Sequence, residues 1–363
     1  MEIQNLISEK KEFNIGIVSC PRAGKTSIIN GLLGFPLLPV TALATLHPLF
    51  KVKYAEMIQI ELCLYNKTKM IPYDELSSDL FEDLLSFYCI CFTVIGLENI
   101  RYFMNKPLKS GTKTISPDEL KMNPNDPRHT ATLLLAVLSA DVEQNENKKN
   151  LEADIKELLR LRRKIFHSIG LSEEDKVSTV TVYWNVPFLK NGLSIVDISE
   201  IGINEIVVLE AVAGVQALMC VLEPIRIHIG SGMLEPMMNI FAQKSAYMDD
   251  GIIIGVVNKI DQIALGGSGD EILLETEKFF NKRGMPAKKI LGLRARDGEY
   301  SYIENGVTSI ENTAFACNRL DYNDKEEGQN ELPRYQAILK RCYENKSGIP
   351  ELRKLLSDLV NTR

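Results

Sequence analysis

The sequence predicts an α/β protein with a mixed, mostly parallel sheet flanked by helices, into which a helical subdomain is inserted. Three observations support this. An apolar run at 15–18 leads through a Gly-Lys-Thr loop into a helical pattern, strand-like runs return from 177 onwards, and the stretch between is helical in periodicity. We therefore expect a first part of the main domain at 1–72, a helical insertion at 73–172, and a second part with terminal helices at 173–363.

The loop at 19–26, Ser-Cys-Pro-Arg-Ala-Gly-Lys-Thr, is typical of a phosphate-binding loop (P-loop). A buried strand that turns into a helix offers backbone N–H groups and the positive end of the helix dipole to an anion. Lys25 is expected to reach the β- and γ-phosphates and Thr26 to ligate Mg²⁺. Ser19 stands where the motif has glycine, which would strain the loop if φ were positive there. The predicted nucleotide-binding positions in this segment are Ala23, Gly24, Lys25, Thr26 and Ser27.

The segment after the first helix carries two candidate threonines. Gly34 and Pro36 end the helical pattern. A threonine about 20 residues beyond the loop closes over Mg²⁺ and the γ-phosphate in switch proteins of this kind. Thr45 fits that spacing as a metal ligand and catalytic residue, and Thr41 is the alternative; both could also lie simply in a β-prone loop. The stretches 49–54 and 57–65 then predict two strands of a meander.

From 74 to about 170 the pattern predicts successive helices. A capping box with proline at its first helical position lies at 116–119, and Gly170 ends an amphipathic helix at 151–169. The apolar stretch 84–97 is too short to span a membrane, so a buried helix is favoured over a membrane-inserting element. Two polar stretches, 123–129 and 143–150, are expected to be loops.

Strand patterns return at 177–186 and 193–197, and the second of these ends in Asp197. An aspartate at the end of an apolar strand supplies the second carboxylate of the Mg²⁺ site in P-loop proteins. A glycine that contacts the γ-phosphate normally lies three residues on, where this chain has Glu200. Either the backbone bulges to bring in Gly202, or sensing of the γ-phosphate is impaired.

Apolar strands are also expected at 217–221 and 252–257, and the second runs into Asn-Lys-Ile-Asp at 258–261. The carboxylate of Asp261 can accept hydrogen bonds from N1–H and N2–H₂ of guanine, a pairing that adenine cannot offer. Asn258 is expected to brace the loop and contact the base, with Lys259 beside it. Within the last predicted strand, 290–296, the backbone N–H of Ala295 is expected near the guanine oxygen.

Composition narrows the function classes. The formal net charge is −6, and no basic stripe could neutralise nucleic-acid phosphates. The seven cysteines lack zinc-ligand spacing, which favours reduced thiols in a cytoplasmic protein. His129 and His167 are expected to be structural or exposed rather than ligands. The predicted small-molecule partners are therefore a guanine nucleotide, GTP or GDP, and Mg²⁺, with no nucleic acid.

Taken together, these segments resemble the P-loop GTPase domain of dynamin-like proteins, particularly the bacterial ones. The resemblance is carried by 23–27, the Leu38-Pro39 step toward Thr45, 191–197, 258–261 and 347–352. It covers about 13–65 and 177–360. It does not explain the helical insertion, and it does not extend to the family's helical stalk, so dynamin-type collars are not expected from this chain alone.

The resemblance implies GTP hydrolysis with Mg²⁺ and nucleotide-dependent association, either as a homodimer through the GTPase domain or with a companion dynamin-like protein. It also implies peripheral membrane association through such a partner. The chain departs from dynamins at Pro21 and Arg22. Arg22 is similar to the loop arginine that guanylate-binding proteins and atlastins use as an internal arginine finger, which makes it a catalytic candidate; a surface arginine near an anion is the alternative.

The sequence thus predicts a GTPase of low turnover. Two other readings stay open. One is a pseudo-GTPase scaffold that regulates a stalk-bearing dynamin-like partner, favoured by Ser19 and Glu200, and the other is a P-loop ATPase, which Asp261 argues against.

Overall fold

The structure, a computed structural model, describes most of the sheet and the helices around it. The described residues are 12–19, 23–39, 48–64, 67–72, 78–95, 120, 122–140, 142, 152–172, 174–198, 212, 214–224, 252–260, 269–282, 284, 287–295 and 347–362.

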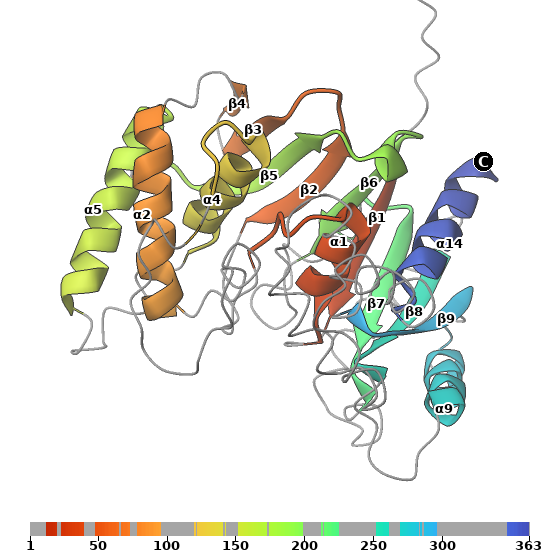
Figure 1. Ribbon diagram of the computed structural model, residues 1–363. Helices are drawn as coiled ribbons and strands as arrows, with labels where there is room; N and C mark the ends of the chain where they lie inside the picture. The colour runs from red at the N-terminus through yellow and green to blue at the C-terminus, as the bar shows by residue number, and fades with distance from the viewer. Residues whose placement is uncertain are drawn as a thin grey trace, which may run out of the picture.

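The described strands form one nine-stranded sheet in the order β4-β3-β5-β2-β6-β1-β7-β8-β9 (Figure 1). Five of its neighbouring pairs are parallel and three are antiparallel. The mixed, mostly parallel sheet flanked by helices is therefore confirmed. The strands are β1 (Phe13–Ser19), β2 (Leu49–Tyr54), β3 (Gln59–Leu64), β4 (Thr68–Pro72), β5 (Val177–Trp184), β6 (Leu193–Asp197), β7 (Ala217–Leu222), β8 (Ile252–Asn258) and β9 (Lys289–Leu293).

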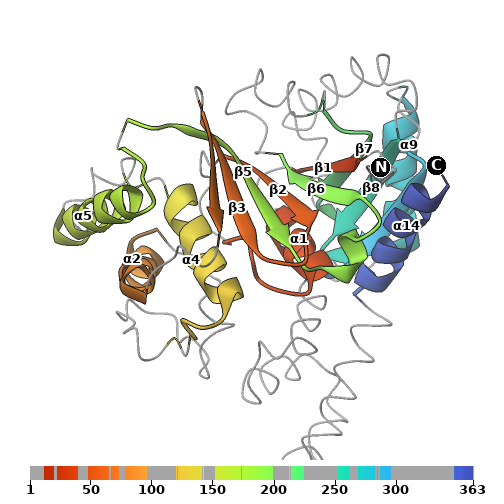
Figure 2. The ribbon, with the colours of Figure 1, turned by 90° about the horizontal axis from the view of Figure 1, so that it is seen from above.

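The parallel half of the sheet consists of β6, β1, β7, β8 and β9. Its strands are apolar on both faces because helices cover both sides; every residue of β7 is buried, for example. Figure 2 shows α1 (Lys25–Leu33) and α14 (Ile349–Asn361) on one face and α9 (Gly269–Lys282) on the other. These strands lie close to the ranges that the sequence predicts.

The other half of the sheet corrects one prediction. β2 and β3 are not neighbours in a meander, because β5 lies between them, parallel to β2 and antiparallel to β3. β2 pairs on its other side with β6 in antiparallel fashion. The true hairpin is β3 with β4. Long-range pairing of β5 therefore replaces the local turn that the sequence suggested.

Three helices lie beyond the β3–β4 edge: α2 (Ser78–Ile95), α4 (Pro127–Ser139) and α5 (Glu152–Ser168). In both views α4 lies between the sheet and the other two helices (Figures 1 and 2). The helix expected across 84–97 belongs to α2, and the helix expected at 151–169 is α5, ended by Gly170 with a φ of +65°. In the part of the chain that the structure describes, no helix is long and apolar enough to cross a bilayer.

The expected loop at 123–129 is shorter than predicted, because α4 begins inside it. Asp126 caps the helix by accepting from the Arg128 backbone N–H at 2.9 Å, and Pro127 occupies the first helical position. His129 is structural, as expected: its Nδ1 accepts from the Asn123 backbone N–H at 2.8 Å. The capping box at 116–119 lies outside the described residues.

Helix α14 holds the end of α1 in place. Arg353 donates from Nε to the Leu32 carbonyl at 3.0 Å and from Nη2 to the Gly31 carbonyl at 2.8 Å. These carbonyls belong to the last turn of α1, which ends at Gly34 with a φ of +71°. A cation at that position satisfies orphan carbonyls and complements the negative end of the helix dipole.

Candidate functional site

The candidate site lies at the carboxyl ends of β6, β1, β7 and β8, where parallel strands commonly present their ligand-binding loops. Because β1 is central and β6 and β7 pair with it on either side, Ser19, Asp197 and Val221 end close to one another. Asn258 ends β8, the next strand along. The topology therefore brings the separate sequence motifs to one edge of the sheet.

Helix α1 starts at this edge. Gly24 is its N-cap, with a φ of +89°, and Lys25 is the first residue of the helix. A Cβ at position 24 would collide with Nδ2 of Asn258, so both the backbone angle and the space require glycine. Ser19, by contrast, lies in the extended β1 strand and is buried. Serine is therefore unstrained there, and the departure from the glycine motif has no backbone cost.

Lys25 and Asp197 form a buried ion pair. Lys25 Nζ lies 2.5 Å from Asp197 Oδ1, and the two side chains are 5% and 4% exposed. Lys25 also donates to the carbonyl of Ile198. Asp197 Oδ1 nevertheless has no hydrogen bond of good geometry among the described residues. The lysine and the aspartate predicted to serve phosphate and metal thus face one another as a buried ion pair.

Asn258 joins three loops. Its Nδ2 donates to the carbonyl of Ala23 at 2.8 Å, and its Oδ1 accepts from the backbone N–H of Ala295 at 2.9 Å. The side chain is buried, so each of these partners would be left unsatisfied without it. Asn258 therefore links the loop before α1 to the residue after β9, and its contact with a base stays a prediction. The Ala295 N–H, predicted to contact guanine, is the group that Asn258 holds.

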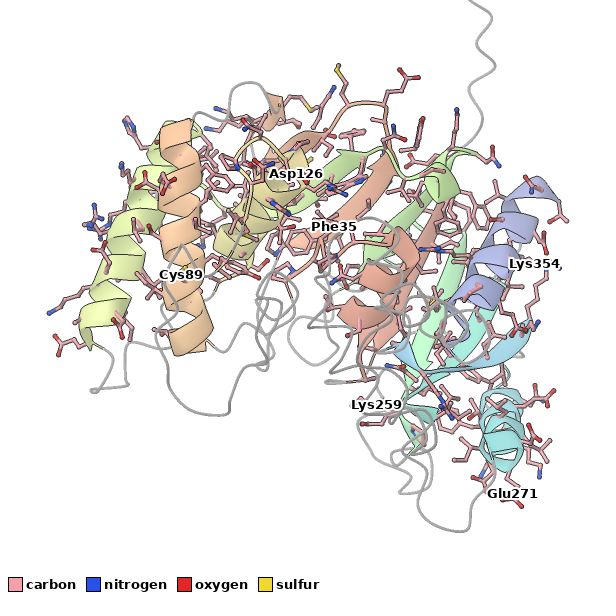
Figure 3. The ribbon with its side chains drawn as sticks, in the orientation of Figure 1. Phe35, Cys89, Asp126, Lys259, Glu271 and Lys354 are labelled. Atoms are coloured by element: carbon pink, nitrogen blue, oxygen red, sulfur yellow. The ribbon has the colours of Figure 1, made fainter. Side chains whose placement is uncertain are left out.

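Lys259 follows in an unusual backbone conformation. Its φ is +60°, the left-handed region, and among the described non-glycine residues it is alone in this. Its Nζ lies 2.7 Å from Oε1 of Glu223, which follows the end of β7 (Figure 3 labels Lys259). Sequence reasoning missed Glu223, because a single glutamate after a strand carries no signal of its own. The pair fixes the direction in which the chain leaves β8.

Asn30 fixes the chain after the C-terminal end of α1. Asn30 Nδ2 donates to the Leu38 carbonyl, and Asn30 Oδ1 accepts from the Leu38 backbone N–H, both at 2.9 Å. Asn30 is buried in the middle of an otherwise apolar helix face. This contact orients the chain as it leaves α1 toward the segment that contains Thr41 and Thr45.

Several predicted site residues lie outside the described residues: Arg22, Thr41, Thr45, Glu200, Gly202 and Asp261. Thr26 and Ser27 are described in the first turn of α1, and both are partly exposed. The structure therefore brings together Ala23, Gly24, Lys25, Asp197, Asn258, Lys259 and Ala295, and the remaining positions stay predictions.

The described residues fit a Mg²⁺-bound nucleotide. A glycine-led helix N-terminus without acidic residues in its first turn suits a phosphate group. The carboxylate of Asp197 is a hard oxygen ligand of the kind that Mg²⁺ prefers, directly or through water, and its Oδ1 is here paired with Lys25.

Comparison with known proteins gives matches among solved structures alone. No protein-family model matches the chain, and no curated protein matches it. Two of the solved structures to which the chain is similar are both described as an oligomerised bacterial dynamin pair that provides a mechanism for long-range sensing and tethering of membranes. Identity is 15% and 14%, with TM-scores of 0.42 and 0.41, over 98% of this chain in each case. The chain spans 44% and 40% of the lengths of those two chains, and the functional argument below rests on its own residues.

Proposed function

We propose that this protein binds Mg²⁺ and GTP and hydrolyses GTP slowly to GDP and phosphate. The observation that carries the proposal is the position of Asn258. Its hydrogen bonds tie Ala23, next to the N-terminus of α1, to Ala295 on the far side of the same edge. The base and the phosphates of one bound nucleotide would contact these two loops at the same time. The loops must therefore be held at a fixed separation, and Asn258 holds them so.

Each residue at the edge has a distinct part in the proposal. The N-terminus of α1 and Lys25 bind the phosphates, which requires Lys25 to exchange Asp197 for phosphate oxygens. Thr26 and Asp197 hold Mg²⁺, with Thr45 as a third ligand. Bound Mg²⁺ would neutralise charge on the β- and γ-phosphates. Arg22 is proposed to stabilise the charge that develops as water attacks the γ-phosphate.

Guanine selection is assigned to Asp261, with Asn258 and Lys259 positioning its loop. A carboxylate accepts from two donors of guanine, whereas an asparagine would offer one acceptor and one donor. Asp261→Asn should therefore weaken GDP binding and strengthen binding of xanthosine diphosphate, whose ring carries an oxygen in place of the amino group. An unchanged preference between these two nucleotides would remove Asp261 from the base site.

The first experiment is calorimetric titration of the full chain with GDP, a non-hydrolysable GTP analogue and ATP, each with Mg²⁺. Binding of both guanine nucleotides and not ATP supports the proposal, and phosphate release by wild type and Arg22→Ala would then be compared. An equal rate in the variant would remove the arginine finger. Loss of binding in Lys25→Met, with an unchanged fold, is the control for the site.

One alternative has a specific observation behind it. Glu200 stands where a γ-phosphate-sensing glycine is expected, and a carboxylate there would oppose the phosphate charge. In a pseudo-GTPase scaffold that regulates a dynamin-like partner, GDP would bind and the GTP analogue would not. No guanine binding at all would overturn the GTPase proposal and leave a nucleotide-free scaffold, whose partner protein would then be sought.

We also propose that nucleotide binding controls association, either between two copies of this domain or with a companion dynamin-like protein at a membrane surface. This rests on the sequence resemblance at 23–27, 191–197 and 258–261. Light scattering of the chain with the GTP analogue and with GDP tests it, and an equal mass in both states would count against it.

A further inference from the structure

A cavity of about 860 Å³ lies away from the nucleotide edge, the edge of the sheet where the proposed nucleotide site lies. Its walls come from four places: the end of α1, the β2–β3 turn, the end of β5, and the N-terminus of α4. In Figure 3 the labelled Phe35 and Asp126, which both line it, lie well apart from Lys259 at the nucleotide edge. The cavity is therefore separate from the site described above, and it lies where the helical layer meets the sheet.

One wall of the cavity is lined by Phe35 and Trp184, whose rings are held in place and largely buried, at 2% and 7% exposed. The rings of Phe35 and Trp184 lie with centroids 5.3 Å apart, and the Arg128 guanidinium stacks on Phe35 at 5.1 Å. Arg128 is in turn held by Asp126, with Nη2 to Oδ2 at 2.6 Å, so its charge is compensated. These contacts fix the wall before any ligand arrives, which lowers the entropy lost on binding.

The opposite rim combines an apolar side chain with an uncompensated charge. Met57, in the β2–β3 turn, is 70% exposed, the largest exposure among the described large apolar side chains. The neighbouring Glu56 is exposed and forms no ion pair within the described part of the chain. A flexible thioether beside a carboxylate, facing an aromatic wall, suits a ligand with an apolar body and a positive end.

We propose that this cavity binds a short segment of a partner polypeptide in which a basic residue is flanked by apolar ones. The basic side chain pairs with Glu56, and the apolar neighbours pack on the exposed Met57 and on the small exposed part of Trp184. A peptide is favoured because Gln59, Asn125 and Asn185 line the same cavity. Carboxamides can both donate to and accept from a peptide backbone.

Trp184 makes the proposal directly measurable, since it is the single tryptophan of the chain. Tryptophan fluorescence of the chain therefore comes from this cavity alone. The probe is a capped pentapeptide, Pro-Leu-Arg-Leu-Pro, titrated into the full chain at low ionic strength. The matched control has the same sequence with glutamate in place of arginine. A saturable change with a Kd below about 1 mM for the basic peptide alone is the expected result.

Two variants at exposed positions test the contacts without disturbing the core. Glu56→Lys should weaken binding of the basic peptide about tenfold, because attraction becomes repulsion, and 0.5 M salt should reduce the difference. Met57→Gln should also weaken binding of the basic peptide. Circular dichroism and the unfolding midpoint should match wild type in each variant, since neither side chain is buried.

The proposal fails if no peptide alters the fluorescence, or if the acidic peptide binds as tightly as the basic one. It also fails if Glu56→Lys binds the basic peptide with wild-type affinity. A fluorescence change that appears on concentrating the protein alone, together with a dimeric mass, would instead assign the cavity to a second copy of the chain. Each readout is independent of nucleotide binding, so a failed GTPase assay leaves it unaffected.

Discussion

Replacing Asn258 with alanine should destabilise the fold and disconnect the two loops that meet at the candidate site, before α1 and after β9. The side chain makes two buried hydrogen bonds, at 2.8 Å to the Ala23 carbonyl and at 2.9 Å from the Ala295 N–H. A typical hydrogen bond contributes about 1 kcal/mol net, and a buried group left unsatisfied costs about 1–3 kcal/mol. Water entering the gap would satisfy part of this, so the expected loss in free energy of unfolding is about 2–4 kcal/mol.

Urea denaturation followed by circular dichroism measures this loss. Asn258→Asp is the informative second variant, because it keeps an acceptor for the Ala295 N–H but turns a carboxylate oxygen toward the Ala23 carbonyl. Asn281→Ala, at an exposed position near the end of α9, is the matched control and should change stability by less than about 0.5 kcal/mol. If Asn258→Ala lost no more than this control, the bridging role assigned to Asn258 would be wrong.

Three further predictions concern other parts of the fold. Gly24→Ala should lower the free energy of unfolding by more than about 2 kcal/mol, because of the positive φ and the collision with Asn258. Gly284→Ala, at a φ of +68° with nothing within 4 Å of the added Cβ, should lower it by only about 1 kcal/mol. Equal losses in urea denaturation would contradict the steric argument. Arg353→Ala should lower the free energy of unfolding by about 2 kcal/mol, and Arg353→Lys by about half of that, because lysine keeps the charge but cannot span both carbonyls. Unfolding midpoints of the two variants measure this difference, and equal midpoints would contradict it. Burial lowers the pKa of His129, so the folded state favours the neutral ring, and stability present above pH 6.5 should fall as pH drops toward the lowered pKa. His129→Gln should flatten that fall between pH 7.5 and 5.5. An equal pH dependence in the variant would refute the prediction.

The parallel half of the sheet was predictable because burial on both faces leaves a local signature. β6, β7 and β8 are short apolar runs bounded by polar loops, and each was expected within about one residue of its position. The same is true of the start of α1, where Gly24 and Lys25 stand directly after an apolar strand. In these segments the local pattern and the global fold agree.

Contacts between distant segments could not be predicted in the same way. The insertion of β5 between β2 and β3 depends on pairing across more than a hundred residues, and none of these three strands carries a pattern that specifies its neighbour. Arg353 lies on the polar side of an amphipathic helix, where any arginine would look solvated. The left-handed φ of Lys259 is similarly hidden, since lysine is not a residue that favours this region.

The position of β5 also has a consequence for how the chain folds. Leu64 and Val177 are partners in the β3–β5 ladder, so the chain leaves the sheet after the edge strand β4 and returns at β5, on the other side of β3. Closing a loop of roughly 110 residues costs about 3 kcal/mol more entropy than closing a four-residue turn. The β3–β5 ladder should therefore form late, after α2, α4 and α5 have drawn its two ends together. Joining Leu64 to Val177 by a two-residue turn, which would also delete β4 and the helical layer, would turn this slow long-range pairing into a local hairpin.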